Sequence, residues 1–210
     1  MPIAEFKNVH FRYPEGTRVF AGLDFSLERG EKVSLAGPNG SGKTTFFLIL
    51  LGLLKAEAGH VVLWDRVMRA EADFREARKK IGFLFQDPDD QVFSPSVEED
   101  VAFGPLNLGM GAHEARHTAE DAMRLLGILD LRERVPSKLS WGQKKLVALA
   151  GVLAMNPELL ILDEPTAGVD DAHREVITRW LRETPQTCLI ASHDAGLLAD
   201  VAGRTHRLDG

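Results

Sequence analysis

Apolar and polar residues alternate along two segments at the start of the chain, residues 3–9 and 19–27. The segments flank the turn Pro14-Glu15-Gly16, so they are predicted to form two strands of an antiparallel region. Most of the later predicted strands are short apolar runs, which are typical of strands buried on both faces of a sheet. These further strands are expected at residues 33–36, 60–63, 81–85, 159–162, 187–191 and 204–208.

Helical patterns separate the predicted strands. Helices are expected at residues 45–54, 73–80, 144–155 and 170–183, and the whole stretch 97–136 is helical in pattern, with 114–126 its longest piece. Strands that alternate with helices predict an α/β chain with a mostly parallel sheet flanked by helices. We expect one domain, with an N-terminal antiparallel β region and an inserted α-helical subdomain. Residues 1–86 and 137–210 would form the core, and residues 87–136 the helical insert.

A glycine-rich loop joins the strand at 33–36 to the helix at 45–54, with the spacing Gly37-x₄-Gly42-Lys43-Thr44. Gly37, Gly40 and Gly42 allow the backbone to turn its N–H groups inward, and the helix directs its positive dipole end to the same point. Lys43 can reach the β- and γ-phosphates of a nucleotide, and the Thr44 hydroxyl can ligate Mg²⁺. The pattern predicts a P-loop NTPase core, although P-loops serve kinases, GTPases, motors and transporters alike.

Composition limits the class of protein. A chain of 210 residues, 44% of them hydrophobic, can bury a sizeable core and fits one domain. The net charge is −6 and no block of like charge exceeds Arg78-Lys79-Lys80, which disfavours a nucleic-acid binder. The longest apolar run, residues 46–54, is too short to cross a bilayer, and the first residues lack the pattern of an export signal.

Several residues that can carry chemistry are better explained by packing or solvation. Cys188 lies within an apolar run, which predicts a buried side chain and a reducing compartment. His113 and His117 have the i, i+4 spacing of a helical metal clamp, but the charged segment around them favours solvated side chains. Trp64 and Trp180 are expected to be packing residues.

Ionisable residues stand at the ends of two predicted inner strands. Asp163 and Glu164 follow the strand at 159–162, and His193 follows the strand at 187–191. Ligands of open α/β sheets gather outside the carboxyl ends of the strands. These three side chains are therefore expected to face the same site as the P-loop.

Together the motifs resemble those of ATP-binding cassette (ABC) ATPases over essentially the whole chain. In order, the sequence is similar to the Walker A motif (37–44), the Q-loop (Gln86), the signature (139–143), the Walker B motif (159–163), the adjoining catalytic glutamate (Glu164), the D-loop aspartate (Asp170) and the switch histidine (His193). The signature usually contains Gly-Gly, and Trp141 stands here in place of the first glycine. The resemblance implies a head-to-tail dimer that encloses two Mg-ATP, in which the signature of one subunit completes the ATP site of the other.

The resemblance also implies roles for single residues. Glu164 would be the general base, with His193, Gln86 and Lys43 as further catalytic residues, and Mg²⁺ would be held by Thr44, Gln86 and Asp163. An aromatic residue such as Tyr13 is often a packing residue, but its place in the family pattern implies stacking on adenine. ATP would be bound by Tyr13, Asn39, Gly40, Ser41, Gly42, Lys43, Thr44 and Thr45. The ATP of the other subunit would be contacted by Ser140, Trp141, Gly142, Gln143 and Asp170.

Within the ABC group, residues 86–93, 97–105 and 150–154 most resemble the cobalt and nickel branch of the energy-coupling factor (ECF) importers. The resemblance implies an ATPase that powers ion uptake from the cytoplasmic face of the membrane. Its partners would be a second ATPase subunit in a homodimer, a transmembrane coupling protein and a substrate-binding membrane protein, and no nucleic acid. An importer of a vitamin such as biotin stays open, as does a soluble ABC ATPase acting on DNA or ribosomes. A P-loop kinase would have no use for the signature.

The segment between Asp87 and Gly104 is expected to dock a helix of the coupling protein. It follows Gln86 directly and leads into the helical stretch. Val92, Phe93 and Val97 are predicted to be its exposed apolar groups. A solvated loop whose apolar residues pack on their own subdomain is the alternative.

Overall fold

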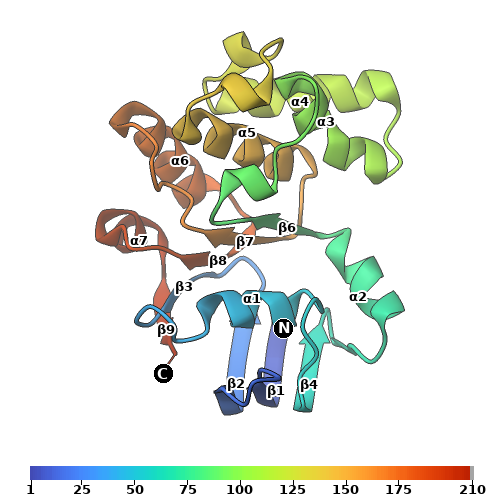
Figure 1. Cartoon of the computed structure of the whole chain (residues 1–210), viewed down its shortest axis with the longest axis vertical. Helices are drawn as coiled ribbons and strands as arrows, with labels where there is room; N and C mark the ends of the chain where they lie inside the picture. Colours follow the sequence, from blue (N-terminus) through green and yellow to red (C-terminus); the bar gives the residue numbers. More distant parts are fainter. Residues whose placement is uncertain (209–210) are drawn as a thin grey trace.

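The computed structural model describes residues 1–208, which form two sheets with a helix between them (Figure 1). The first sheet is antiparallel and has the strand order β2-β1-β4-β5. Its strands are β1 (Pro2–Arg12), β2 (Arg18–Glu28), β4 (Ala58–Leu63) and β5 (Arg66–Val67). The predicted antiparallel region is therefore confirmed, with β4 added on the other side of β1.

The second sheet is parallel and has the strand order β6-β7-β8-β3-β9. Its strands are β3 (Lys32–Ala36), β6 (Ile81–Leu84), β7 (Leu159–Asp163), β8 (Thr187–Ala191) and β9 (Arg204–Arg207). Successive residues of β7 enter different cores: Leu160 and Leu162 face the helices α3 to α7, whereas Leu159 and Ile161 face α1. Burial on both faces explains why this strand is apolar throughout.

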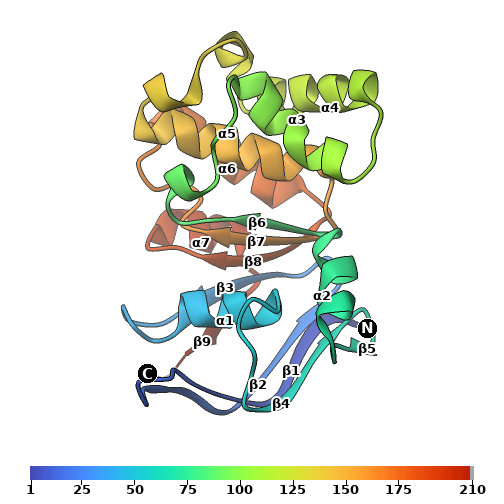
Figure 2. The same cartoon turned by 45° about the vertical axis from the view of Figure 1, so that its right-hand side comes forward.

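Helices cover both faces of the parallel sheet, with α1 on one side and α3, α4 and α5 on the other (Figure 2). The α-helices are α1 (Lys43–Leu50), α2 (Glu71–Arg78), α3 (Val97–Asn107), α4 (Ala112–Leu125), α5 (Trp141–Ala154), α6 (Asp171–Glu183) and α7 (Ala195–Val201). Short 3₁₀ helices are η1 (Pro88–Asp90), η2 (Leu129–Leu131) and η3 (Pro136–Lys138). These elements confirm the predicted mixed α/β class, with a parallel sheet, an antiparallel sheet and flanking helices.

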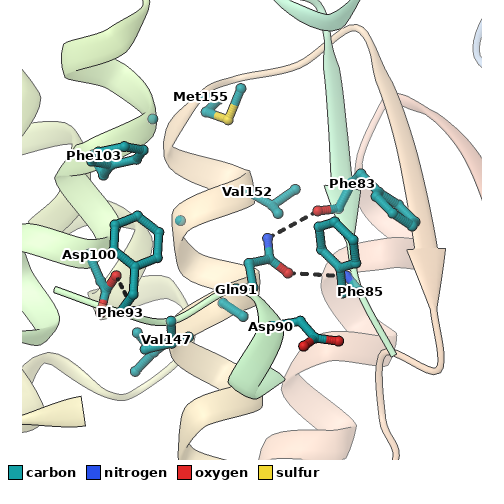
Figure 3. A pocket seen from close by; sticks show the side chains of 14 residues that line it. Phe83, Phe85, Asp90, Gln91, Phe93, Asp100, Phe103, Val147, Val152 and Met155 are labelled. Atoms are coloured by element: carbon teal, nitrogen blue, oxygen red, sulfur yellow. Dashed lines mark hydrogen bonds between the residues drawn. The ribbon is translucent and has the colours of Figure 1, made fainter. Parts of the chain in front are cut away.

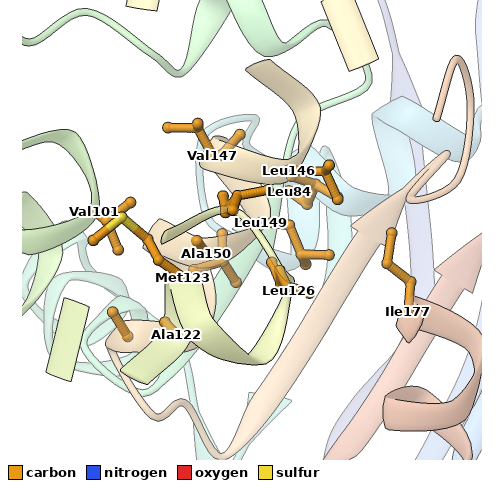
Figure 4. Packing of buried hydrophobic residues seen from close by; sticks show 14 of the residues in the cluster. Leu84, Val101, Ala122, Met123, Leu126, Leu146, Val147, Leu149, Ala150 and Ile177 are labelled. Carbon is orange, nitrogen blue, oxygen red and sulfur yellow. The ribbon is translucent and has the colours of Figure 1, made fainter. Parts of the chain in front are cut away.

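One core holds α3, α4 and α5 together above the parallel sheet. Val101 of α3, Met123 of α4 and Ala150 of α5 are fully buried in it. Figure 4 shows these side chains gathered with Leu149 and Leu84, so the helical layer is anchored to β6. That the helical insert begins at residue 87 and ends at 136 stays a prediction.

The C-terminal end of α1 differs from the sequence prediction. The helix ends at Leu50 rather than at Leu54, because Gly52 takes up the left-handed conformation (φ 71°) and Leu53 N–H donates to the Leu48 carbonyl at 2.8 Å. A Cβ on Gly52 would lie 2.2 Å from Cγ of Phe74, so the turn also needs glycine for packing against α2.

Candidate functional site

The glycines of the loop between β3 and α1 stand where a larger residue would be strained or crowded. Gly40 and Gly42 have φ angles of 83° and 96°, which other residues rarely adopt. A Cβ on Gly42 would lie 2.4 Å from Cγ1 of Val19, and a Cβ on Gly37 would lie 2.3 Å from Oγ of Ser41. The loop leads directly into the N-terminus of α1, where unpaired N–H groups and the helix dipole attract an anion.

Two side chains of this loop are suited to an anionic ligand. The Lys43 ammonium donates to the carbonyl oxygens of Gly37 at 2.7 Å and Pro38 at 3.1 Å, so the cation lies across the loop. The Ser41 hydroxyl is buried and has no hydrogen-bond partner within residues 1–208. Thr44 is exposed at the start of α1. A triphosphate and a hard cation fit this set of donors and oxygen ligands.

An open pocket of about 660 Å³ lies beside the loop. Tyr13 borders it, and its hydroxyl forms a 2.9 Å hydrogen bond with Oγ1 of Thr45 while its ring packs edge-on against Phe11 at 5.0 Å. The ring therefore has a packing contact and also borders the pocket. The pocket brings together most of the predicted site residues: Tyr13, Asn39, Gly40, Gly42, Lys43, Thr44, Thr45, Gln86, Asp163, Glu164 and His193.

Asp163 ends β7 at the inner edge of this pocket and is almost fully buried. Burial, and after it the neighbouring Glu164 carboxylate, raise the pKa of Asp163 to about 6, against the opposing effect of Lys145, Lys43 and His193. A second pocket, of about 510 Å³, is lined by Thr44, Gln86 and Asp163 together. The structure thus brings the three predicted metal-binding residues to one place, although their binding of Mg²⁺ stays a prediction.

Glu164 is held in a strained turn directly after β7. Its φ of 53° is unusual for a residue with a Cβ, and its N–H donates to the Ala191 carbonyl of β8 at 2.8 Å. The Ser192 hydroxyl and the His193 backbone N–H donate to its Oε2 at 3.1 and 3.2 Å. The His193 Nε2 atom lies 3.8 Å from the other oxygen. The carboxylate is therefore fixed, while the imidazole is mostly exposed and borders the pocket.

The predicted signature forms the N-terminus of α5, one turn earlier than the predicted helix. Ser140 caps the helix: its Oγ accepts from Gln143 N–H at 3.2 Å, and its own N–H donates to Oε1 of Gln143 at 3.0 Å. Neither of these two bonds uses the hydroxyl proton of Ser140, which can therefore donate to a ligand. A Cβ on Gly142 would lie 2.3 Å from the Gly168 carbonyl, so this glycine allows the close approach of the segment before Asp170.

The predicted contacts to a second subunit lie side by side. The Trp141 ring packs on Gly168, where a Cβ would be 2.4 Å from Cε3, and Asp170 follows two residues later. Asp170 caps α6, and its carboxylate contacts His173 Nδ1 at 2.7 Å. Ser140, Gly142, Gln143 and Asp170 are not among the described residues that line the 660 or 510 Å³ pockets, whereas Trp141 lines the 510 Å³ pocket with Thr44, Gln86 and Asp163 of its own chain. A role of these five residues at a second subunit stays a prediction.

Sequence patterns did not reveal Lys145, which is fully buried behind Asp163. Its ammonium donates to the carbonyl oxygens of Phe85, Gln86 and Asp163 at 2.7, 2.9 and 3.0 Å. Burial lowers its pKa to about 8, against the attraction of Asp163, Glu164 and Asp87. One feature of the sequence could have indicated this burial: Lys145 lies in a predicted helix, and the residues that follow it in that helix are all apolar.

One predicted exposure is wrong. Val97 is fully buried, because it begins α3 inside the core and its N–H donates to the Arg134 carbonyl at 3.0 Å. Val92 is half-buried against the same core. Phe93 is 66% exposed, as predicted.

The residues assigned to packing or solvation behave as follows. Cys188 is buried, as predicted, and burial raises the pKa of its thiol to about 12. Trp64 packs partly against the core and donates from Nε1 to Glu158 at 2.8 Å. The exposed rings of His113 and His117 meet edge-on at 4.5 Å, and residues 1–208 contain no cluster of three or more His, Cys, Asp or Glu suited to a metal ion. No helix within the same residues is long and apolar enough to span a bilayer.

A P-loop that shares one pocket with Asp163, Glu164 and His193 is suited to ATP hydrolysis, and comparison with known proteins shows the class of ATPase. The family model described as ABC transporter matches residues 20–167. The energy-coupling factor transporter ATP-binding protein EcfA of Methanocaldococcus jannaschii is 43% identical over 98% of this chain and 75% of that protein. A putative ABC transporter ATP-binding protein of Gloeobacter violaceus is 45% identical over 97% of this chain and 84% of that protein.

Solved structures similar to this chain are also ATP-binding cassettes or parts of ABC transporters. The structure of cbiO1 from Clostridium perfringens, part of the ABC transporter complex cbiONQ, is 38% identical with a TM-score of 0.80, over 92% of this chain and 79% of that one. A dimeric ATP-binding cassette in a post-hydrolysis state, bound to ADP and Pi, is 26% identical with a TM-score of 0.89, over 98% of this chain and 94% of that one. The chain belongs to the ABC transporter family, as an ATPase subunit of the energy-coupling factor type.

Proposed function

We propose that this ATPase powers the uptake of cobalt or nickel ions, by ATP-driven closure of a homodimer against a transmembrane coupling protein. A separate membrane protein would bind the solute, and the ATPase would be held by its partners on the cytoplasmic face of the membrane. Support comes from the similarity to cbiO1 and from residues 86–93 and 97–105, which resemble the cobalt and nickel branch. The observation that carries the coupling to transport is an apolar groove close to Gln86, with the exposed rings of Phe93 and Phe103 at its edge.

ATP would be held between the P-loop and Tyr13. The N–H groups of residues 40–45 and the Lys43 ammonium would bind its phosphates, and the phenol ring would stack on adenine. The Ser41 hydroxyl, without a partner within residues 1–208, would gain one beside the phosphates. Thr44 and Asp163 would hold Mg²⁺, with Gln86 next to them. Bound Mg²⁺ would neutralise charge on the phosphate oxygens.

Glu164 would accept the proton of the attacking water. The bonds from Ser192 Oγ and His193 N–H occupy Oε2, which leaves Oε1 directed to the side of His193 and available for a water molecule. His193 would donate to the γ-phosphate and stabilise the charge that develops there, together with Lys43. The strained backbone of Glu164 supports this role, because such strain is concentrated at functional sites.

The signature would act on the ATP of a second subunit. The free hydroxyl proton of Ser140 and the N–H of Gly142, in the first turn of α5, would donate to the γ-phosphate there. Trp141, Gln143 and Asp170 would complete the contact. Two such chains arranged head to tail would thus enclose two ATP molecules, and Mg-ATP would stabilise the dimer by mass action.

The groove beside Gln86 would take a helix of the coupling protein. It measures about 260 Å³ and lies between β6, η1, α3 and α5, with mostly apolar lining. Phe93 and Phe103 stand at its rim, with ring centroids 5.0 Å apart, and Gln91 closes its floor by bonding to the backbone of Phe83 and Phe85 (Figure 3). An amphipathic helix laid into the groove would bury the exposed Phe93 ring.

Uptake by the complete transporter tests the proposed solute. The complex would be purified through a tag on this ATPase and reconstituted in vesicles, with uptake of radiolabelled cobalt, nickel and biotin measured with ATP on the ATPase side. ATP-dependent uptake of either metal supports the proposal. Uptake of biotin alone would assign the chain to the vitamin alternative, and isolation of the ATPase with ribosomes or DNA instead of membrane proteins would favour the soluble one.

A further inference from the structure

Lys145 lies where the second turn of α5 meets the carboxyl ends of β6 and β7. An ammonium group has three N–H donors and no acceptor, and here three backbone carbonyls lie at 2.7 to 3.0 Å from it. Two of these carbonyls belong to Gln86 and Asp163 themselves. Because a buried charge is costly unless it is fully paired, packing alone would favour an apolar residue at this position.

Trp141 covers the ammonium from the solvent side. Lys145 Nζ lies 5.6 Å from the centroid of the indole, which stands one turn earlier on α5. The same ring packs against Gly168. The unusual tryptophan of the signature therefore has a contact within its own chain, beside the fully buried Lys145.

The adjacent Lys144 provides a contrast. Its ammonium pairs with the Asp89 carboxylate of η1 at 2.5 Å, and that carboxylate is exposed. Lys144 thus binds a surface side chain, whereas Lys145 binds the main chain at the ends of β6 and β7. Neither lysine is among the described residues that line the 660 Å³ pocket.

We infer that Lys145 is a positioning residue for ATP hydrolysis: it ties the ends of β6 and β7 to the signature helix, and so fixes Gln86 and Asp163 opposite the P-loop. This inference rests on the roles proposed above for those two residues. Without the ammonium, the backbone carbonyls of Phe85, Gln86 and Asp163 lose this donor and the strand ends can shift. A displacement of about 1 Å at reacting groups can cost roughly a hundredfold in rate. ATP binding by the P-loop and Tyr13 should be retained.

Lys145→Met tests the inference, because methionine keeps the length and bulk of the side chain but has no donor. We expect kcat for ATP hydrolysis to fall about tenfold or more while KM for ATP stays within about threefold. In the nucleotide-free protein, hydrogen exchange of the amides around Gln86 and Asp163 should become faster. Lys144→Met is the matched control, with near-normal kcat and unchanged exchange at both strand ends.

Lys145→Gln is a second variant for the case that Lys145→Met does not fold. Its amide keeps two N–H donors on a shorter side chain. We expect its kcat to lie between those of the wild type and Lys145→Met. Normal kcat per folded molecule in either variant would overturn the inference, as would a change in KM equal to that in kcat. Hydrolysis is measured without membrane partners, so this outcome is independent of whether the transported solute is cobalt, nickel or a vitamin.

Discussion

An ion pair between α6 and α7 holds the turn that carries His193, and its strength can be measured. Arg174 donates from Nε and Nη2 to the two Asp194 oxygens at 2.6 Å each. Asp194 also accepts from Leu197 N–H at 3.0 Å and from the Thr166 hydroxyl at 3.1 Å. The Arg174 guanidinium is the main cause that holds the pKa of Asp194 at about 2, below its ordinary value of 3.8.

Arg174→Met should destabilise the fold by about 1 kcal/mol at neutral pH. The full gap between the two Asp194 pKa values corresponds to about 2.4 kcal/mol. The Arg174 side chain is 42% exposed, so solvent screening reduces the part of this free energy that Arg174 contributes. Because the pKa is depressed in the folded state, the stabilisation is present above about pH 4 and lost as the pH falls to about 2, with roughly half remaining near pH 3.

Urea unfolding followed by circular dichroism, at a series of pH values from neutral to about 3, measures this difference. The difference in the free energy of unfolding between the wild type and Arg174→Met should decrease as the pH falls. Arg179→Met is the control on the same helix, since Arg179 pairs with Glu175 at 3.3 Å at the exposed surface, and it should change stability by less than about 0.5 kcal/mol. Equal losses in the two variants, or a gap that does not change with pH, would refute the reasoning.

Three further predictions follow from the proposed roles. Glu164→Gln should lower hydrolysis at least about a hundredfold with ATP binding intact, and comparable turnover would remove Glu164 as the base. The same variant should be monomeric without nucleotide and dimeric with Mg-ATP by light scattering; a monomer under both conditions would favour a heteromeric assembly. Phe93→Asp should hydrolyse ATP normally alone but lose transport and co-purification with membrane proteins, and intact transport would place the docking surface elsewhere.

Local sequence patterns predicted the elements whose cause is local. The apolar run of β7 reflects burial on both faces of the parallel sheet, and the glycines of the loop at 37–42 are needed at the positions where they stand. Asp163, Glu164 and His193 could be assigned to one site because the carboxyl ends of parallel strands share an edge. These features can be inferred from local backbone geometry or from a general property of the fold, although Gly42 also packs against the distant Val19.

The features that sequence patterns missed depend on distant parts of the chain. Lys145 has partners that are 60, 59 and 18 residues away, so its burial as a cation could not be inferred from its own helix. Val97 appeared exposed because it follows a polar loop, yet its N–H bonds to Arg134 and its side chain enters the core. The packing of Gly52 against Phe74 of α2 likewise depends on a distant residue, although the left-handed turn that ends α1 is local.

A single helix, α5, connects the three surfaces that a transport ATPase must coordinate. Ser140 at its N-cap and Gly142 in its first turn are the groups proposed to contact a second subunit. Lys145 in the next turn binds the strand ends at Gln86 and Asp163, and the later turns line the groove proposed for the coupling protein. Because all three surfaces lie on one continuous helix, a shift of the helix at one surface would displace the others. Energetic coupling of this kind is reciprocal, so a docked membrane helix must change the affinity for Mg-ATP by the same factor by which Mg-ATP changes docking.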